Sequence, residues 1–188
     1  RRIRQQADTL ITFEHQTASE CAGKFADLDL HSVFEPAAEA ITQCVSGIVC
    51  GLEGQMLGID IEDLRTCFEG QKFGFYSQGA ARGEETSDLA IQRALIAHPC
   101  SAYLKYSPAL FVVFRARRNT LRLQMVNSGT TLIRKLASND CHIIMATFFD
   151  DKLEADEIRV GLLAGFNQDP RHQKVVIRER LAIDQVPQ

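Results

Sequence analysis

The sequence predicts a layered domain of the α/β (or α+β) class, in which one long buried helix precedes four strands and three shorter helices. Three observations lead to this prediction. The chain has 188 residues, of which 45% are apolar, and a chain of this size buries about 70% of its unfolded surface in a single core. Apolar residues recur at helical spacing over residues 33–52. After residue 72, short apolar stretches of strand length alternate with helical ones.

The longest predicted element is a helix over residues 33–52. Pro36 lies near its start, where a helix tolerates proline, and Gly51 and Gly54 mark its end. Because most of its circumference is apolar, we expect this helix to be buried on more than one side, as the central helix of the domain. Two neighbouring stripes carry this pattern, one formed by Phe34, Ala37, Ala38, Ile41, Val45, Ile48 and Leu52, the other by Val33, Ala40, Cys44 and Val49.

The remaining elements follow from alternation, helical spacing and glycine or proline boundaries. Before the long helix we expect a short strand at 7–13 and a loop or linker at 14–29. After it, the predicted order is a helix at 61–68, a strand at 72–77, a turn at 79–85, a helix at 87–97, a strand at 109–116, a helix at 124–137, a strand at 141–148, a turn at 149–156, a strand at 157–166 and a polar tail.

Composition and charge limit the function. The formal net charge of −3 attracts neither nucleic acid nor anionic lipid, and the longest apolar run, Ala109–Phe114, is too short for membrane insertion. The six cysteines form no Cys-x-x-Cys pair, which favours a reduced, cytoplasmic chain, with disulfides as the alternative. Because the chain starts with Arg1 and shows no signal-peptide pattern, we expect it to be cut from something longer.

Few motifs carry chemistry of their own. The sequence contains no phosphate-binding glycine loop, no Gly-x-Ser-x-Gly elbow and no His-Glu-x-x-His helix, and its five histidines are too scattered for a metal site. A basic cluster has two interpretations: it contacts phosphates, or it is a strand end followed by a solvated turn. The absence of interleaved aromatic residues favours the second. The cluster consists of Arg115, Arg117, Arg118 and Arg122.

The stretch Gly58–Arg65 has catalytic character. Asp60 is suited to cap a helix, and Glu62 and Asp63 in the first turn interact favourably with the helix dipole. Alternatively, two carboxylates presented where a loop meets a helix can orient and polarise a water molecule. Taken alone, the local spacing favours capping and does not exclude catalysis.

Asp60-x-x-Asp63-Leu-Arg-Thr66 is similar to the loop pattern Asn-x-Asp-Phe-x-Asp-Val-(Lys/Arg)-Thr of a known family. From Asp60 onward the chain resembles the C-terminal half of that family's proteins, FtsZ, the bacterial and archaeal relatives of tubulin. The most specific similarity is Asp150–Val160 with Ala164-Gly165-Phe166, which resembles the family's last two strands. The resemblance covers about residues 7–166. Its further segments are Ala7–Ile11, Phe34–Ile48, Gly79–Glu84 and Ala90–Pro99.

The resemblance implies a long central helix followed by a four-stranded mixed sheet with helices packed on it, as in the C-terminal domain of FtsZ and tubulin. Residues 1–28 would be the strand and linker at the end of a missing nucleotide-binding domain, and residues 29–53 the central helix. Residues 54–166 would form the C-terminal domain, and residues 167–188 a tail.

The resemblance also implies a function. In FtsZ, aspartates of this loop complete the GTPase site of the next subunit in the filament. Asp63 would therefore position or activate the attacking water, Asp60 would support that water and its cation, and Phe34 would pack on the guanine. GTP or GDP with Mg²⁺ would be bound by the full-length protein, and neither binding nor activity is expected of this chain alone. Expected partners are further copies, head to tail in a filament or paired through the central helix, and other division proteins.

Three departures from the family pattern bear on activity. Gly58 stands at an Asn of the loop, Ala38 at an Asn that contacts guanine, and Arg117-Arg118 at a Gly-Gly turn. Each departure that removes a polar group paired with a base or a water costs about 1–3 kcal/mol of interaction free energy. Two function classes therefore stay open: the GTPase-activating half of an FtsZ-like cytoskeletal GTPase of cell division, or a non-hydrolysing FtsZ-like assembly or filament-capping module. For a third, an unrelated small-molecule-binding α/β domain, the sequence outlines no pocket.

Overall fold

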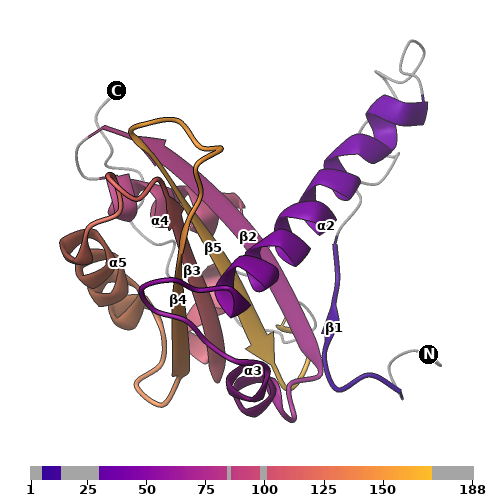
Figure 1. Ribbon diagram of the computed structural model, residues 1–188. Helices are drawn as coiled ribbons and strands as arrows, with labels where there is room; N and C mark the ends of the chain where they lie inside the picture. Colours follow the sequence, from indigo (N-terminus) through magenta and orange to yellow (C-terminus); the bar gives the residue numbers. More distant parts are fainter. Residues whose placement is uncertain (1–5, 14–29, 84–85, 98–100, 171–188) are drawn as a thin grey trace.

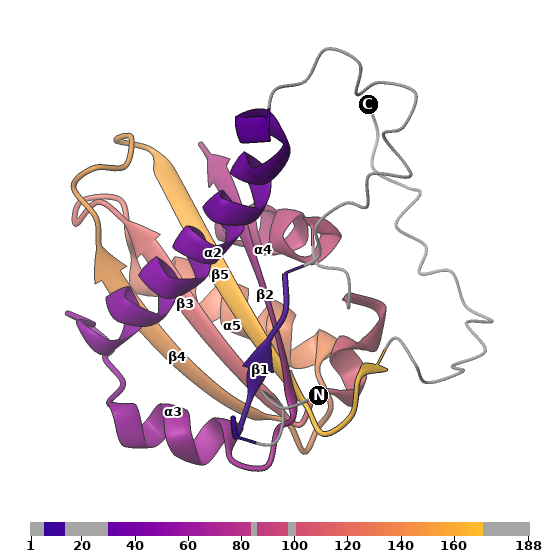
Figure 2. The same ribbon diagram turned by 90° about the vertical axis from the view of Figure 1, so that its right-hand side faces the viewer.

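The computed structural model describes residues 6–13, 30–83, 86–97 and 101–170, with the backbone alone at 30–34, 36, 86 and 101. This part of the chain forms a five-stranded sheet with helices on both faces (Figures 1 and 2). The expected loop at 14–29 and the tail beyond residue 170 lie outside the described residues. In chain order the elements are β1 (Leu10–Ile11), α2 (Leu30–Leu52), α3 (Ile61–Phe68), β2 (Phe73–Arg82), α4 (Thr86–Ala97), the 3₁₀ helix η3 (Ser101–Tyr106), β3 (Ala109–Ala116), α5 (Leu123–Leu136), β4 (His142–Phe149) and β5 (Glu157–Phe166).

The sheet is mixed, in the order β1-β2-β5-β3-β4. Strand β5 lies between β2 and β3 and is antiparallel to both, whereas β1 and β4 run parallel to their neighbours β2 and β3. The predicted α/β class is confirmed. The sheet has one strand more than the predicted four, because Leu10 and Ile11 pair with Phe73 and Gly74 of β2.

Strand β2 is longer than predicted. The sequence predicts a turn from Gly79, yet β2 continues to Arg82 and pairs with β5 over its full length. Gly79 lies against α4: a Cβ added there would be 2.0 Å from the carbonyl oxygen of Ala90. The glycine therefore allows α4 to pack closely on β2. The sequence pattern predicts a turn at Gly79, whereas its role in the structure is close packing.

Two apolar cores lie on opposite faces of the sheet. On one face, Leu110, Val112 and Phe114 of β3 pack with α4 and α5. On the other, Phe111 and Val113 pack with the buried side chains of α2 and α3. Since both faces are covered, β3 reads as a continuous apolar run rather than an alternating one.

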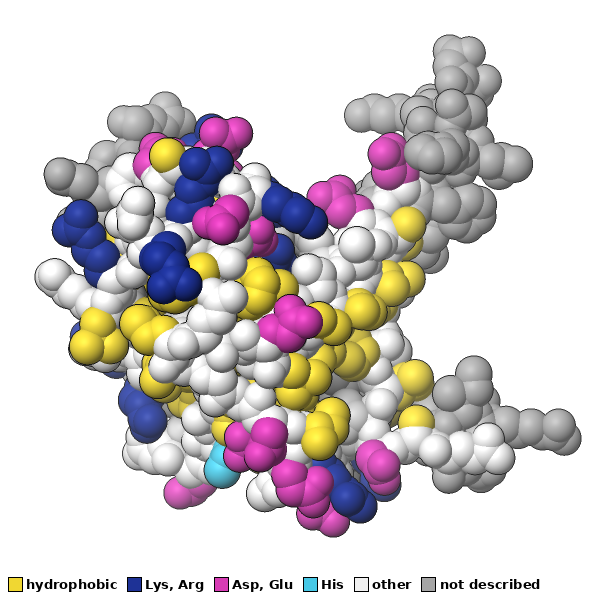
Figure 3. Space-filling view, in the orientation of Figure 1, with side chains coloured by type: hydrophobic (Ala, Val, Ile, Leu, Met, Phe, Trp, Pro, Cys, Tyr) yellow, Lys and Arg dark blue, Asp and Glu magenta, His cyan; other side chains and the backbone are white. Residues whose placement is uncertain are grey.

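The expectation that the long helix is buried on more than one side is wrong for the residues the structure describes. Cys44, Gly47, Cys50 and Gly51 of α2 are buried against the sheet. The opposite side is open to solvent (Figure 3), and its exposed large side chains are Ile41, Val45, Val49 and Leu52, at 47, 56, 44 and 37% exposure. An apolar circumference indicates how much surface a helix is able to bury, and the described chain covers one side of it.

Candidate functional site

The connection between α2 and α3, residues 53–60, is a tight loop that ends at the two predicted aspartates. The N–H groups of Gly54 and Ile59 both donate to the carbonyl oxygen of Gly51, which closes the end of α2. A Cβ on Gly54 would lie 2.5 Å from the Cα of Gly58 and from the carbonyl oxygen of Leu57. The loop therefore folds back on itself so closely that Gly54 has no room for a side chain.

Asp60 and Asp63 form a reciprocal capping box at the start of α3. The carboxylate of Asp60 accepts a hydrogen bond from the Asp63 N–H at 2.8 Å, and the carboxylate of Asp63 accepts one from the Asp60 N–H at 3.0 Å. The predicted cap is thus confirmed. Both residues are exposed, and within the described residues the second oxygen of each carboxylate has no hydrogen-bond partner. The box holds two adjacent carboxylates in fixed orientation toward solvent, an arrangement able to orient a water molecule.

The far end of α3 anchors this corner to the sheet. Cys67 and Phe68 are buried, and the Cys67 thiol lies 3.9 Å from the carbonyl oxygen of Leu110 and 3.7 Å from that of His142. Burial raises the pKa of the Cys67 thiol to about 12, so it stays protonated at neutral pH. Ile61, beside the aspartates, is 66% exposed. Helix α3 is therefore buried at its C-terminal end and exposed at the end that carries the carboxylates.

The third predicted residue, Phe34, is not near the aspartates. Its backbone belongs to the first turns of α2, which project away from the sheet at the end of that helix remote from α3 (Figure 1). Its side chain lies outside the description. From Phe34 to Leu52 the helix rises about 27 Å. The structure thus brings Asp60 and Asp63 together and leaves Phe34 at the opposite end of the long helix.

Arginines of the basic cluster contact other residues of the domain, which agrees with the interpretation of a strand end followed by a turn. Arg117 donates to the carbonyl oxygen of Leu153, and the guanidinium of Arg118 lies 4.6 Å from the ring centre of Phe149. Sequence reasoning missed one contact. Arg115, 11% exposed, forms a 2.6 Å ion pair with Asp150, itself 9% exposed. The available signal was an arginine at an inward position of an apolar strand, followed by an aspartate directly after the neighbouring strand.

Despite the effect of burial, the pairing with Arg115 lowers the pKa of Asp150. Burial by itself raises the pKa of Asp150, but the hydrogen bonds from Arg115 and from the Lys152 N–H, together with the charge of Arg115, hold it below its ordinary value of 3.8. The Nε atom of Arg115 is buried without a hydrogen-bond partner in the described part of the chain. The pair faces the α2 side of the sheet, because Arg115 follows Phe111 and Val113 in the alternation of β3.

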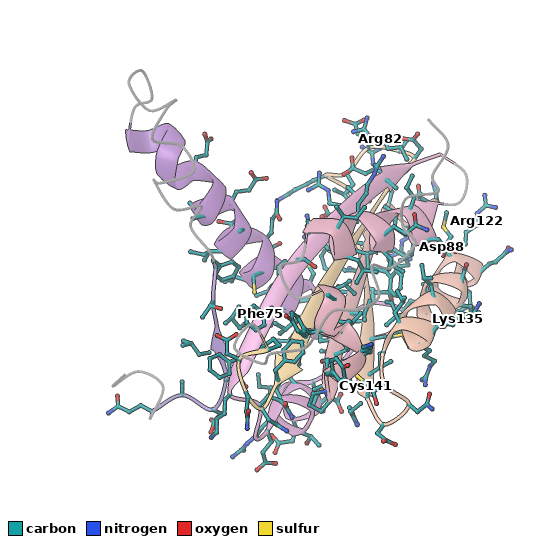
Figure 4. All side chains as sticks on the ribbon, turned by 180° about the vertical axis from the view of Figure 1, so that it is seen from behind. Phe75, Arg82, Asp88, Arg122, Lys135 and Cys141 are labelled. Carbon is teal, nitrogen blue, oxygen red and sulfur yellow. The ribbon has the colours of Figure 1, made fainter. Side chains whose placement is uncertain are left out.

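Other polar groups lie elsewhere on the molecule. Between α4 and α5, Asp88 accepts hydrogen bonds from Ser87 at 3.3 Å and from Ser128 at 2.9 and 3.1 Å, with Arg122 nearby (Figure 4). These groups line an open surface hollow and largely satisfy one another. Within the described residues, no group of three His, Cys, Asp or Glu side chains is placed to hold a metal ion. None of the described helices is long and apolar enough to cross a membrane.

Comparison with known proteins shows which solved structures this fold resembles. No protein-family model matches the chain. Solved structures do: FtsZ of M. jannaschii, described as an empty dimer, has a TM-score of 0.74 and 18% identity, over 89% of this chain and 48% of that one. CetZ2 from Haloferax volcanii, described as a GTPgS-bound protofilament, has a TM-score of 0.65 and 14% identity, over 87% and 48%. CetZ from Methanosaeta thermophila has 0.64 and 15%, over 90% and 46%.

The chain has the fold of FtsZ and CetZ. The resemblance to FtsZ is thereby confirmed at the level of the fold, which is what identities of 14–18% show. The chain spans about half the length of these FtsZ and CetZ structures. On this FtsZ-like fold, the capping box of Asp60 and Asp63 is the arrangement most suited to chemistry.

Proposed function

We propose that this chain is the C-terminal, GTPase-activating and polymerisation half of an FtsZ-like cytoskeletal GTPase that acts in cell division in the cytoplasm. It donates Asp60 and Asp63 to the GTP site of the adjacent subunit. The observation that carries the proposal is the reciprocal capping box, which holds both carboxylates rigidly at an exposed corner of the FtsZ-like fold. A rigid, pre-oriented group contributes more to catalysis than a mobile one.

In this proposal the two aspartates have separate tasks. Asp63 accepts a hydrogen bond from the attacking water and takes up its proton as the water oxygen bonds to the γ-phosphorus and the bond from that phosphorus to the bridging oxygen of the leaving GDP breaks. Asp60 orients that water and supports the cation. GTP and Mg²⁺, bound by the neighbouring subunit, supply the reactive phosphate and neutralise its charge. Exposure of both carboxylates fits this task, because a group that works on a neighbour's substrate must lie on the surface.

The separation between Phe34 and the two aspartates is compatible with a head-to-tail filament. Phe34 and Leu52, near the two ends of α2, lie about 27 Å apart along the helix, and the aspartates follow the Leu52 end, so one nucleotide does not reach both sites. In a head-to-tail filament the two ends of the helix serve different nucleotides: Phe34 packs on the guanine bound by its own subunit, and Asp60 and Asp63 reach the GTP of the next.

The test of the proposal is Asp63→Ala in the full-length protein that contains this chain. GTP turnover falls about 10²-fold or more, the typical contribution of a positioned acid–base group, while filaments still sediment. Glu62→Ala is the matched control, since Glu62 is a neighbouring exposed acid whose contact is a 3.6 Å ion pair with Arg65. Unchanged turnover in Asp63→Ala would leave the aspartate with its capping role alone.

That outcome favours the second candidate, a non-hydrolysing assembly or filament-capping module. Its supporting observation is the pair of departures at Gly58 and Ala38, which remove polar groups from the loop and from the guanine contact. The sequence upstream of Arg1 discriminates between the two. An intact Gly-Gly-Gly-Thr-Gly-Thr-Gly signature supports the GTPase, and a degraded one supports the module.

A further test uses the 188-residue chain alone. Because it contains no phosphate-binding glycine loop, it binds no GTP with useful affinity. Isothermal titration calorimetry checks this directly. Micromolar binding would contradict both the assignment of the chain to the C-terminal half and the division of labour between subunits.

We also propose that two copies of the isolated chain pair through α2. The exposed stripe of Ile41, Val45, Val49 and Leu52 continues into Met56 and Leu57, at 41 and 39% exposure. An apolar patch of several hundred Å² on a monomer usually marks an interface, and a two-fold axis brings the same stripe of both copies together. Light scattering tests this: Val45→Ser or Val49→Ser weakens association, and Glu39→Gln, on the same helix, does not. A clean monomer at high concentration contradicts it.

A further inference from the structure

Thr147 of β4 makes an unusual set of contacts with the loop that carries the aspartates. Its hydroxyl accepts a hydrogen bond from the Leu57 N–H at 2.8 Å. Its own N–H donates to the carbonyl oxygen of Leu57 at 2.7 Å, and its carbonyl oxygen accepts from the Gln55 N–H at 3.1 Å. A single residue, 90 positions away in the sequence, therefore holds both ends of the short segment Gln55–Leu57.

This attachment matters because it joins the exposed segment Gln55–Leu57 to the sheet. Gln55, Met56, Leu57 and Gly58 are all exposed, whereas Thr147 is 0% exposed. Strand β4 is the outer strand of the described sheet, so the loop runs along its open edge and is joined there by backbone pairing. The rigid sheet fixes Thr147, and Thr147 fixes the loop.

Gly58 and Ile59 connect Leu57 to the capping box, so the position of Leu57 affects the position of the box. Ile59 is buried, and its N–H reaches the carbonyl oxygen of Gly51 at 3.4 Å. Asp60 follows directly and starts α3. Between Leu57 and Asp60 there are two residues, one of them Gly58, so a displacement of Leu57 moves the start of α3 and both carboxylates with it. The C-terminal end of α3 is anchored separately through Cys67, so the end that carries the carboxylates is supported by the Thr147 contacts and by the Ile59–Gly51 hydrogen bond.

We propose that the hydroxyl of Thr147 is a positioning group for Asp60 and Asp63. It sets where the loop delivers the N-terminus of α3, and with it the geometry of the two carboxylates toward the neighbouring nucleotide. The inference rests on the proposed function and deepens it. A shift of about 1 Å in a positioning element is enough to cost up to about 10²-fold in rate, and supporting hydrogen bonds are what prevent such a shift.

The test compares Thr147→Val and Thr147→Ser in the full-length protein. Valine keeps the shape of threonine and removes the hydroxyl. The Leu57 N–H loses its acceptor and the Leu57 carbonyl oxygen loses the hydroxyl donor at 3.4 Å, while the two backbone hydrogen bonds remain. We expect kcat for GTP to fall about 10-fold or more, with KM, nucleotide affinity and filament mass unchanged. Serine restores the hydroxyl and keeps kcat within about twofold of wild type, a rescue that the loss of a methyl group from a merely structural threonine would not produce.

Two controls keep this separate from the proposed function. Thr130→Val removes a part-buried threonine hydroxyl on α5 that donates to the Val126 carbonyl of its own helix at 2.6 Å, and it leaves kcat unchanged. Asp63→Ala is assayed in parallel. If Asp63→Ala keeps full turnover, the proposed function fails; if Asp63→Ala is inactive and Thr147→Val is not, only the role of Thr147 is overturned. An equal loss in Thr130→Val also overturns it.

A second measurement needs no activity. In the 188-residue chain, hydrogen exchange at the Leu57 amide is slow in wild type and in Thr147→Ser, and at least about 10-fold faster in Thr147→Val, while amides of β3 keep their protection. Equal exchange at Leu57 in Thr147→Val shows that the hydroxyl does not hold the loop and overturns the inference. Protection lost throughout β3 shows a global role for Thr147 and overturns it as well.

Discussion

The two faces of the sheet differ in how completely they are covered. On the face covered by α4 and α5, the core residues Leu110, Val112 and Phe114 are fully buried and the helices above them close the layer. On the face covered by α2 and α3, Phe111 beneath the helix is equally buried, yet Val45 and Val49 on top of it are 56 and 44% exposed. The same strand serves both faces, so the strand sequences do not explain the difference.

What differs is the outer surface of each layer. On α4 and α5, the exposed large apolar side chains are Leu89, Ile96 and Leu123, and they lie among exposed polar and charged residues such as Gln92, Arg93 and Lys135. The α2–α3 face ends in an apolar stripe along α2, where Figure 3 shows hydrophobic side chains at the surface, and it also carries the exposed residues Asp60 and Asp63. The comparison teaches that both faces carry a buried core, and that the contacts we propose with a neighbouring nucleotide and with another copy all lie on the α2–α3 face.

The largest expected effect is in the closed core. Phe114→Ala on the α4–α5 face removes a fully buried ring and lowers the free energy of unfolding by about 3–5 kcal/mol. Val49→Ala on the open face changes it by less than about 0.5 kcal/mol. Urea unfolding of the 188-residue chain, at a concentration where it is monomeric, measures both. Similar losses in the two variants would contradict the difference between the faces.

The second effect concerns the buried ion pair beneath α2. Asp150→Ala leaves Arg115 buried without its partner, and we expect a loss of about 3 kcal/mol. Because the pKa of Asp150 is lowered in the folded state, the contribution of the pair is fully present above the ordinary value of 3.8 and is lost as the pH falls through the lowered folded pKa. The stability difference between wild type and Asp150→Asn therefore shrinks below about pH 4. A constant difference down to pH 2 contradicts this assignment.

A smaller effect is expected at the cap of α3. Asp60→Ala removes the acceptor of the Asp63 N–H and costs about 1 kcal/mol. Asp60→Asn, which keeps an acceptor oxygen, costs less, and Glu62→Ala is the exposed control. Thermal unfolding followed by circular dichroism separates them. Equal melting temperatures for Asp60→Ala and Asp60→Asn would show that the capping hydrogen bond does not stabilise the helix.

The smallest effect is expected on the open stripe itself. Val45→Ser, measured at a concentration where the chain is monomeric, changes the free energy of unfolding by no more than about 0.5 kcal/mol, because its side chain is 56% exposed. If this substitution unfolds the sheet, Val45 belongs to the core of the domain and the exposed face has been assigned wrongly.

The sequence by itself determined the local elements of this protein. Helix α3 and strands β3 and β5 have the predicted bounds of 61–68, 109–116 and 157–166, because helical spacing and apolar runs act over neighbouring residues. The cap of α3 was also readable, since Asp60 and Asp63 are three positions apart and satisfy each other's backbone. The resemblance in these segments was enough to predict the FtsZ-like fold.

Only the tertiary structure decided which distant residues meet. It paired Leu10 with Phe73 as a fifth strand, extended β2 past Gly79 because α4 packs there, and placed Asp150 against Arg115. It also brought Thr147 to Leu57 and left one side of α2 open. A sequence shows that a side chain is apolar or able to form a hydrogen bond. Whether a partner covers that side chain depends on segments tens of residues away, whose approach no local pattern specifies.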